Sequence, residues 1–151
     1  KNRDECELWG FNSRLDALQA RIASIKLRHL ENWNKRFREI VDIYRQNLCD
    51  LVITPNDLDH EEPVYHNFVI RVEANIRDKL MDFMMNKGVE TKIHYPIPIH
   101  LQECSKNLGY SIGDFPKTEN FAKEMISLPI YPELENSDLD IVVGTLKEFF
   151  N

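Results

Sequence analysis

Residues 13–48 read SRLDALQARIASIKLRHLENWNKRFREIVDIYRQNL, without a proline or a glycine. Apolar side chains recur along this run at steps of three and four, the period of an amphipathic helix. They are Leu15, Leu18, Ile22, Ile25, Leu30, Trp33, Phe37, Ile40, Val41, Tyr44 and Leu48. One continuous helix here would be about 50 Å long, whereas a globule of 151 residues is about 40 Å across. The pattern therefore predicts a linking helix over residues 13–49 that outruns its own domain, unless it is broken in two.

The residues at the head of this helix are typical of an anion site. Ser13, followed three residues later by Asp16, resembles a capping box with Asp in place of Glu. The free N–H groups and the positive dipole potential of a helix N-terminus favour phosphate. Asn12 and Arg14 could add an amide donor and a guanidinium. Simple capping, with Arg14 in solvent, is the alternative that spacing alone leaves open.

Beyond residue 49 the sequence changes to shorter elements. Runs of branched and aromatic residues predict strands, and apolar periods with Asn75, Pro116 and Ser137 at their starts predict helices. The expected strands are 64–72, 89–94 and an edge strand at 127–132, and the expected helices are 75–87, 116–126 and 137–150. This order predicts the α/β class, with a short sheet packed by helices in a small domain over residues 50–151.

The composition excludes several classes of partner. The chain has 42% hydrophobic and 29% charged residues, which is ordinary for a globular protein. Its net charge of −6 argues against nucleic acid or an anionic membrane as the main partner. No apolar run approaches the ~18 residues of a membrane span, and the first residues are too polar for a signal peptide. Three widely spaced cysteines suit reduced thiols. We expect a cytoplasmic protein and, because the chain starts at Lys1 and not at Met, a sequence that continues upstream.

The segment His94-Tyr95-Pro96-Ile97-Pro98-Ile99-His100 is the strongest candidate for a ligand site. Its two prolines forbid a continuous helix and stiffen the backbone. Rigid irregular backbone that carries His94, Tyr95 and His100 resembles the wall of a binding site. Ordinary packing of a proline-rich crossover is the alternative. A metal site that also uses Cys104 is disfavoured, because the spacing matches no common zinc motif.

Other polar features receive ordinary interpretations. His66 lies in an expected strand, where a lone histidine is usually structural. The acidic loop 57–62 is interpreted as a solvated connector. The sequence contains no serine in a nucleophile elbow, no H-E-x-x-H and no P-loop. Hydrolytic chemistry therefore has little support.

Several segments together resemble one enzyme family. In chain order they are WGFNSRLDALQARI, ENWNKR, VYHNFVI, GVETKIHYPIPIHLQ and LGYSIGDFPKTENFAKEMISLPIYPEL, followed by the closing amphipathic helix. This series is similar to the C-terminal part of the DegT/DnrJ/StrS sugar-nucleotide aminotransferases, which use pyridoxal phosphate. The version with proline after His94-Tyr95 is most like the subgroup that aminates C3 of dTDP-3-keto-6-deoxyhexoses, and the subgroup that aminates C4 stays open.

The resemblance implies a fold, a dimer and a set of site residues. The fold would be the small C-terminal domain of a fold-type I, aspartate-aminotransferase-like enzyme, with residues 1–12 as the end of a large upstream domain. Such enzymes are homodimers with active sites at the subunit interface. Asn12 would reach the cofactor phosphate of the partner subunit, and Arg14 would lie near phosphate or nucleotide-sugar charge. His94 and Tyr95 would line the sugar pocket, and we include His100 as a third substrate-binding candidate.

The chain departs from the family in lacking its cofactor lysine motif. The Schiff-base lysine is expected upstream, so no catalytic residue is assigned here and the chain alone should be inactive. The complete enzyme would transfer an amino group by ping-pong kinetics, with glutamate as the expected donor, to a keto-deoxysugar nucleotide in amino-sugar or polysaccharide biosynthesis. Two alternatives are a stand-alone binding module of the same fold and a pyridoxal-phosphate-dependent sugar dehydratase.

Overall fold

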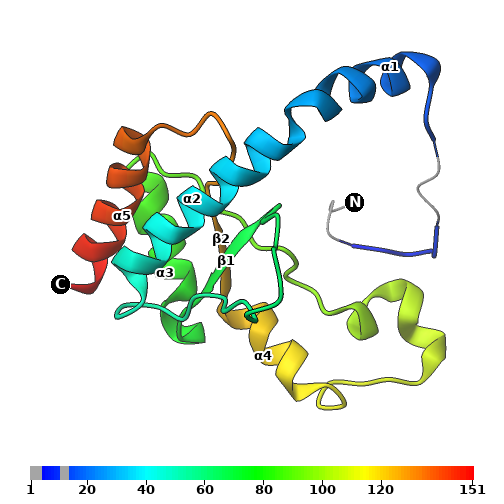
Figure 1. The fold of residues 1–151 in the computed structure, drawn as a ribbon. Helices are drawn as coiled ribbons and strands as arrows, with labels where there is room; N and C mark the ends of the chain where they lie inside the picture. Colours follow the sequence, from blue (N-terminus) through cyan, green and yellow to red (C-terminus); the bar gives the residue numbers. More distant parts are fainter. Residues whose placement is uncertain (1–4, 11–13) are drawn as a thin grey trace.

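The computed structural model describes residues 5–10 and 14–151. A two-stranded sheet lies beside helices, and a long helical arm extends away from them (Figure 1). The elements are α1 Ala17–Lys26, a 3₁₀ turn Leu27–His29, α2 Leu30–Leu48, β1 Phe68–Arg71, α3 Ala74–Asn86, 3₁₀ turns Ile99–Leu101 and Glu103–Leu108, α4 Pro116–Glu124, β2 Met125–Leu128 and α5 Asn136–Phe150. The predicted α/β class, a short sheet packed by helices, is confirmed.

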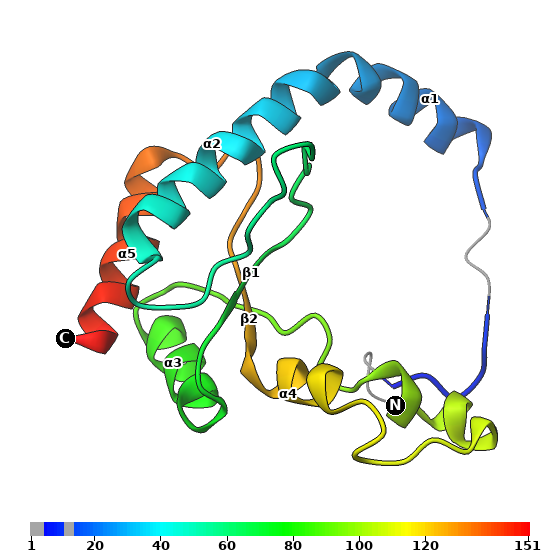
Figure 2. The ribbon, with the colours of Figure 1, turned by 60° about the horizontal axis from the view of Figure 1, so that its bottom comes forward.

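The predicted linking helix is an arc of two helices, α1 and α2 (Figure 2). The 3₁₀ turn between them ends at His29, whose φ of −104° and ψ of −6° depart from helical values. The first helix begins at Ala17, and its N-cap is Asp16, whose backbone N–H donates to Gln19 Oε1 at 3.3 Å. The capping box predicted for Ser13 and Asp16 is therefore formed by Asp16 and Gln19, because Gln has the reach that the N3 position needs. Ser13 itself lies outside the described residues.

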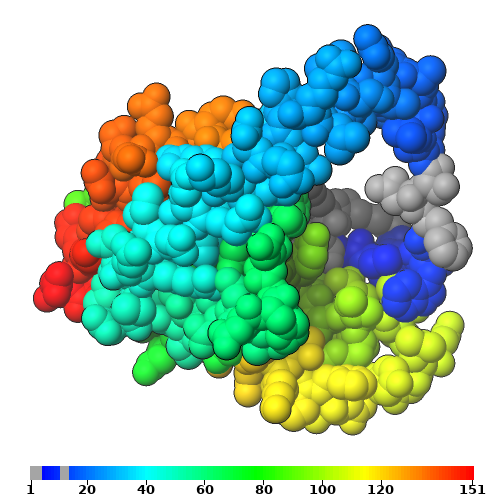
Figure 3. Space-filling view, in the orientation of Figure 1, coloured from blue at the N-terminus to red at the C-terminus, as the bar shows by residue number. Residues whose placement is uncertain are grey.

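The apolar face of α1 and of the residues just before it is exposed. Leu15 is 74% exposed and Leu18 72%, and Ile22 and Ile25 are each 46% exposed. The helix contains no buried residue, and in the space-filling view it stands away from the rest of the described chain (Figure 3). None of the described helices is both long and apolar enough to cross a membrane. The apolar face of α1 is thus not covered by any described residue.

The sheet is formed by β1 and β2, which run antiparallel. Phe68 lies opposite Leu128 at one end of the ladder, and Arg71 lies opposite Met125 at the other. Helices α2, α3 and α5 gather on one side of this pair (Figures 1 and 2). The helices pack on one another there, α2 and α3 both on α5.

An isolated β-bridge pairs one further residue with the outer side of each strand. Ile53 bridges to Arg71 beside β1, with N–H···O distances of 2.9 and 3.0 Å. Lys92 bridges to Ser127 beside β2, with distances of 2.7 and 3.2 Å. Strand β2 is therefore paired on both sides at Ser127.

The strands are shorter than the sequence predicted. The run 64–72 is a strand only at 68–71, the run 89–94 contributes only the bridge at Lys92, and the strand predicted at 127–132 occupies 125–128. β2 lies at an edge of the two-stranded sheet, as predicted, and its outer side is paired only at Ser127. Pro129, which has no N–H to pair, lies just beyond the ladder and not within it. The chain passes directly from α4 into β2, so the helix predicted to reach residue 126 ends at Glu124.

The core lies between the sheet and α2, α3 and α5. Its largest fully buried side chains are Tyr44, Phe68, Ile40, Leu48, Ile70, Leu80, Met84, Ile126, Leu139 and Leu146. The ring of Tyr44 stacks on that of Phe68, with 5.2 Å between centroids. Its hydroxyl donates to the carbonyl oxygen of Pro129 at 2.7 Å, so a buried polar atom is paired, as burial requires. This bond ties α2 to the end of β2.

The irregular segment between residues 95 and 115 is held by one buried carboxylate. Glu119 accepts hydrogen bonds from the backbone N–H of Gly113 at 2.8 Å and of Phe115 at 3.3 Å. His100 Nε2 lies 3.1 Å from the same carboxylate, and the His100 ring lies on that of Phe115 with 4.7 Å between centroids. Gly113 has a φ of +100°, which a side chain would strain. The bond from Gly113, then those from His100 and Phe115, lower the pKa of Glu119 against the opposing effect of burial.

Replacing Tyr44 by Phe should lower the free energy of unfolding by about 1–2 kcal/mol, because the carbonyl of Pro129 loses its buried donor while the ring packing is kept. Urea denaturation of the chain measures this. The matched control is Tyr110→Phe, since Tyr110 is 49% exposed; it should change stability by less than about 0.5 kcal/mol. Equal effects of the two changes would contradict the role given to Tyr44.

Replacing Glu119 by Gln should destabilise the chain near neutral pH and progressively less in acid. A carboxyl whose pKa is lowered on folding stabilises the fold above its unfolded pKa, and this stabilisation is lost as the pH falls through the folded pKa. The ordinary value is 4.5, so the urea midpoints of the parent and of Glu119→Gln should converge below that pH. A gap that stays constant into strong acid would contradict this account.

Candidate functional site

A cavity of 530 Å³ opens where several segments leave the sheet. Its wall is formed by residues 66–67 before β1, residues 88–94, the end of β2 with residues 129–131, and the first half of α5. Its size is in the range of small-molecule sites, about 300–1,000 Å³. Polar and apolar side chains both contribute to the wall, which suits a ligand that has both kinds of surface.

His94 is the predicted site residue that lines this cavity. Its Nδ1 lies 2.9 Å from the Oγ of Ser127, which is buried at the doubly paired position of β2. Among the described residues, only Nδ1 of the two ring nitrogens has a hydrogen-bond partner. The imidazole is thus oriented by the sheet, and Nε2 is left for a ligand.

Tyr95 and His100 have different surroundings from His94. Tyr95 is 64% exposed and lies outside the cavity wall, with its ring edge-to-face on His94 at 5.6 Å between centroids. His100 is buried beside Glu119, in the cluster that holds the 95–115 segment, and also lies outside the wall. The structure therefore brings Tyr95 next to His94 but puts His100 in a separate environment.

Asn12 and Arg14 are the two residues predicted to bind the cofactor. Asn12 lies outside the described residues. Arg14 is exposed and makes no ion pair with any described residue. It precedes α1, whose N-cap is the acidic residue Asp16, paired in a capping box with Gln19.

Metal ligands are not grouped in the described part of the chain. Within residues 5–10 and 14–151, no set of three His, Cys, Asp or Glu side chains could hold a metal ion. His94 is paired with Ser127 and His100 with Glu119. Cys104 instead donates its backbone N–H to the carbonyl of Cys6 at 2.9 Å, and all three cysteines are free thiols.

Sequence reasoning missed one histidine of the cavity wall. His66, which was interpreted as structural, is exposed and lines the cavity together with His94. Alternation from Phe68 and Ile70, which are buried, would put His66 on the core side of a longer strand. The strand begins only at Phe68, and Tyr65 has a φ of +49°. The alternation therefore does not extend to His66, and no signal in the sequence marks this break.

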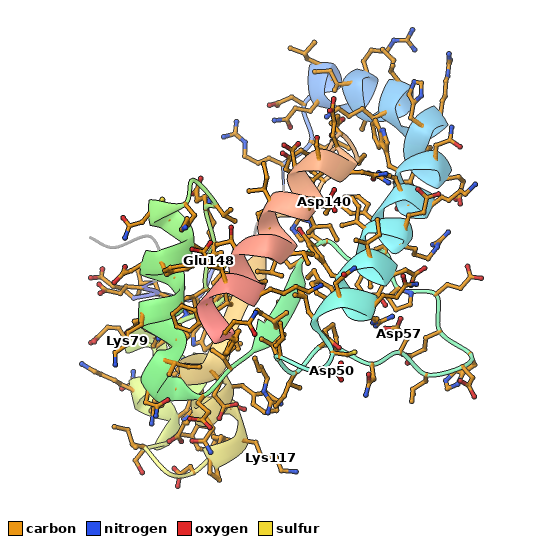
Figure 4. All side chains as sticks on the ribbon, turned by 90° about the vertical axis from the view of Figure 1, so that its left-hand side faces the viewer. Asp50, Asp57, Lys79, Lys117, Asp140 and Glu148 are labelled. Carbon is orange, nitrogen blue, oxygen red and sulfur yellow. The ribbon has the colours of Figure 1, made fainter. Side chains whose placement is uncertain are left out.

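A polar cluster fixes the backbone next to His66. Arg45 of α2 donates to Asp57 Oδ2 at 2.8 Å, to the Tyr65 hydroxyl at 2.9 Å and to the Pro55 carbonyl at 2.6 Å. The Tyr65 hydroxyl also donates to Asp57. Asp57 lies on the loop that follows α2 (Figure 4), so it is an ion-pair partner and not only part of a solvated connector.

The cluster shifts the pKa of two of its members. The hydrogen bond from Arg45 lowers the pKa of Asp57 against the cost of its burial. Burial, with a further contribution from Asp57, raises the pKa of Tyr65 to about 12. Near neutral pH the cluster therefore has one cation, one carboxylate and one neutral phenol, which are mutually hydrogen-bonded.

Comparison with known proteins gives a consistent result. The family described as DegT/DnrJ/EryC1/StrS aminotransferase matches residues 1–147. Over 145 residues, 93% of this chain and 38% of the relative, the chain is 41% identical to a pleiotropic regulatory protein of Geobacillus stearothermophilus. It is 35% identical over 145 residues to dTDP-3-amino-3,4,6-trideoxy-alpha-D-glucose transaminase of Streptomyces venezuelae, covering 95% of this chain and 38% of the relative. The chain thus spans about 38% of the length of these relatives.

Solved structures share the fold. DesV of S. venezuelae, in complex with a ketimine intermediate, superposes with a TM-score of 0.87 at 33% identity, over 100% of this chain and 41% of that one. NtdA of Bacillus subtilis, with bound cofactor PMP, superposes with a TM-score of 0.80 at 28% identity, over 93% of this chain and 34% of that one. By its match over residues 1–147 and by the fold it shares with these relatives, the chain belongs to the DegT/DnrJ/EryC1/StrS aminotransferase family.

Proposed function

We propose that this chain is the C-terminal part of a pyridoxal-phosphate-dependent aminotransferase that acts on a keto-deoxysugar nucleotide. The observation that carries the proposal is the 35% identity, over 95% of the chain, to a transaminase named for a dTDP-3-amino sugar. A second relative, at 36% identity, is named as dTDP-3-amino-3,6-dideoxy-alpha-D-galactopyranose transaminase. Both names support C3 of a dTDP-linked hexose as the position aminated.

In this proposal the cofactor and the residues of this chain have different roles. Pyridoxal phosphate, when bound, supplies the electron sink through which an amine is exchanged for a carbonyl oxygen. Arg14, with Asn12, would hold its phosphate. The donor would be glutamate, and the Schiff-base lysine would belong to the part of the enzyme outside this chain. The active form would be a homodimer in the cytoplasm, and Asn12 and Arg14 would serve the partner's site.

His94 would orient the sugar in the cavity. Because its Nδ1 is engaged by Ser127, Nε2 is the atom that would exchange a hydrogen bond with a sugar hydroxyl or the keto oxygen. Tyr95, exposed beside the His94 ring, would contact the substrate outside the cavity. For His100, whose imidazole faces Glu119, we propose an indirect part: it would shape the 95–115 segment rather than touch the sugar.

Direct assay tests the function. The complete protein, loaded with pyridoxal phosphate, should convert a dTDP-3-keto-6-deoxyhexose and glutamate into the 3-amino sugar nucleotide and 2-oxoglutarate. Mass spectrometry detects the new amine, and NMR gives its position on the ring. Loss of water from the sugar without a new nitrogen would indicate the dehydratase alternative and contradict the proposal. Absence of any reaction would favour the stand-alone binding module.

Replacing His94 by Ala in the complete enzyme should raise KM for the keto-sugar nucleotide about tenfold, the loss of one good hydrogen bond. Retention of the cofactor should be unchanged, because His94 is assigned to the sugar. The matched control is His60→Ala, since His60 is exposed on the 57–62 loop and should leave both quantities unchanged. An unaltered KM in His94→Ala would remove the sugar-binding assignment.

A further inference from the structure

The cavity that contains His94 has a second imidazole with no assigned part. His66 lies on its wall and is exposed. Neither of its ring nitrogens has a hydrogen-bond partner among the described residues. The buried His100, by contrast, uses a ring nitrogen within the fold, on Glu119. The imidazole of His66 is therefore open to the cavity and available to a ligand.

The backbone that carries His66 is fixed on both sides. Tyr65, before it, is held through its hydroxyl by Arg45 and Asp57, and the Arg45 guanidinium lies 5.5 Å from the centre of its ring. Phe68, which follows at the start of β1, is fully buried and stacked on Tyr44. A side chain on such a backbone binds a ligand with little loss of conformational freedom.

The charges of the cavity indicate which part of a nucleotide sugar it suits. Lys92 is its one cationic wall residue among those described, and its Nζ lies 3.4 Å from Glu90, which lines the same wall. Asp138 of α5 adds a second carboxylate. A diphosphate would therefore meet more negative than positive charge, which is unfavourable. A neutral hexose ring meets no such penalty.

The remaining wall suits a hexose as well. His66 and the Nε2 atom of His94 offer hydrogen-bonding groups. Leu134 and Ile141 offer apolar surface to the C–H groups of a deoxysugar. The volume of 530 Å³ accommodates a hexose together with water.

We propose that His66 is a second sugar-binding residue, which with His94 holds the hexose ring in this cavity, and that Tyr65 is a positioning residue for it. The inference rests on the proposed function, because it takes the hexose to be that of the keto-sugar nucleotide. It adds a sugar contact from a different segment of the chain. It also gives the Arg45–Asp57–Tyr65 cluster a role, which is to position His66.

The test uses the complete enzyme with cofactor and two separate half-reactions. His66→Ala should raise KM for the keto-sugar nucleotide about tenfold, the loss of one hydrogen bond, while the half-reaction with glutamate stays within about twofold of the parent. His66→Gln, which keeps a donor and an acceptor, should recover part of the loss. Tyr65→Phe, which removes only the hydroxyl, should raise the same KM by a smaller factor. His60→Ala, with the other exposed loop histidine, is the control and should change nothing.

A binding measurement supplies a readout independent of turnover. Calorimetric titration with the aminated sugar nucleotide should give a weaker Kd for His66→Ala, and titration with dTDP alone should give the same Kd for both proteins. An active parent enzyme with unchanged KM and Kd in His66→Ala would overturn this inference alone. A lowered Tm with unaltered sugar kinetics would also overturn it, by showing a structural part. A parent enzyme that aminates no keto-sugar nucleotide would overturn the proposed function and the inference together.

Discussion

The double pairing of Ser127 is the constraint on which the site depends. On one side Ser127 lies opposite Val69 of β1. On the other side its backbone N–H and carbonyl both bond to Lys92. Its hydroxyl, fixed by this backbone, meets Nδ1 of His94. One strand position thus sets the separation of three chain segments and the orientation of the imidazole between them. Pro129, which has no N–H to pair, lies just past the end of the ladder, and residues 129–131 line the cavity there.

The packed core and the exposed arm occupy different parts of the molecule. The buried side chains begin at Ile40 in α2 and end at Leu146 in α5, and α1 contributes none. The amphipathic arm has an apolar face without a described partner, and the chain spans about 38% of the length of its relatives. The packed unit therefore lies between α2 and α5, and α1 lies outside it. The Arg45 cluster braces the backbone next to His66, and the Glu119 cluster braces the 95–115 segment that follows His94.

Helices could be predicted from the sequence because their signals are local. Apolar periods and Pro116 placed α3, α4 and α5 within a residue or two of their observed starts. Strand lengths could not be predicted in this way, because the residues that pair lie far apart in the chain, as Ser127 and Lys92 do. The same difference between local signals and distant contacts applies to the candidate site. His94 stood out by its prolines, whereas the partnership of His100 with Glu119 and the exposure of His66 depend on tertiary contacts and on the left-handed turn at Tyr65, which neighbouring residues do not reveal.

A structure of the complete protein with a bound dTDP-amino-sugar product would test the central claim most directly. The account predicts the hexose ring in the cavity beside β2, within hydrogen-bond distance of His94 Nε2, with Ser127 still on Nδ1. A hexose bound elsewhere, with this cavity filled by protein side chains, would contradict it.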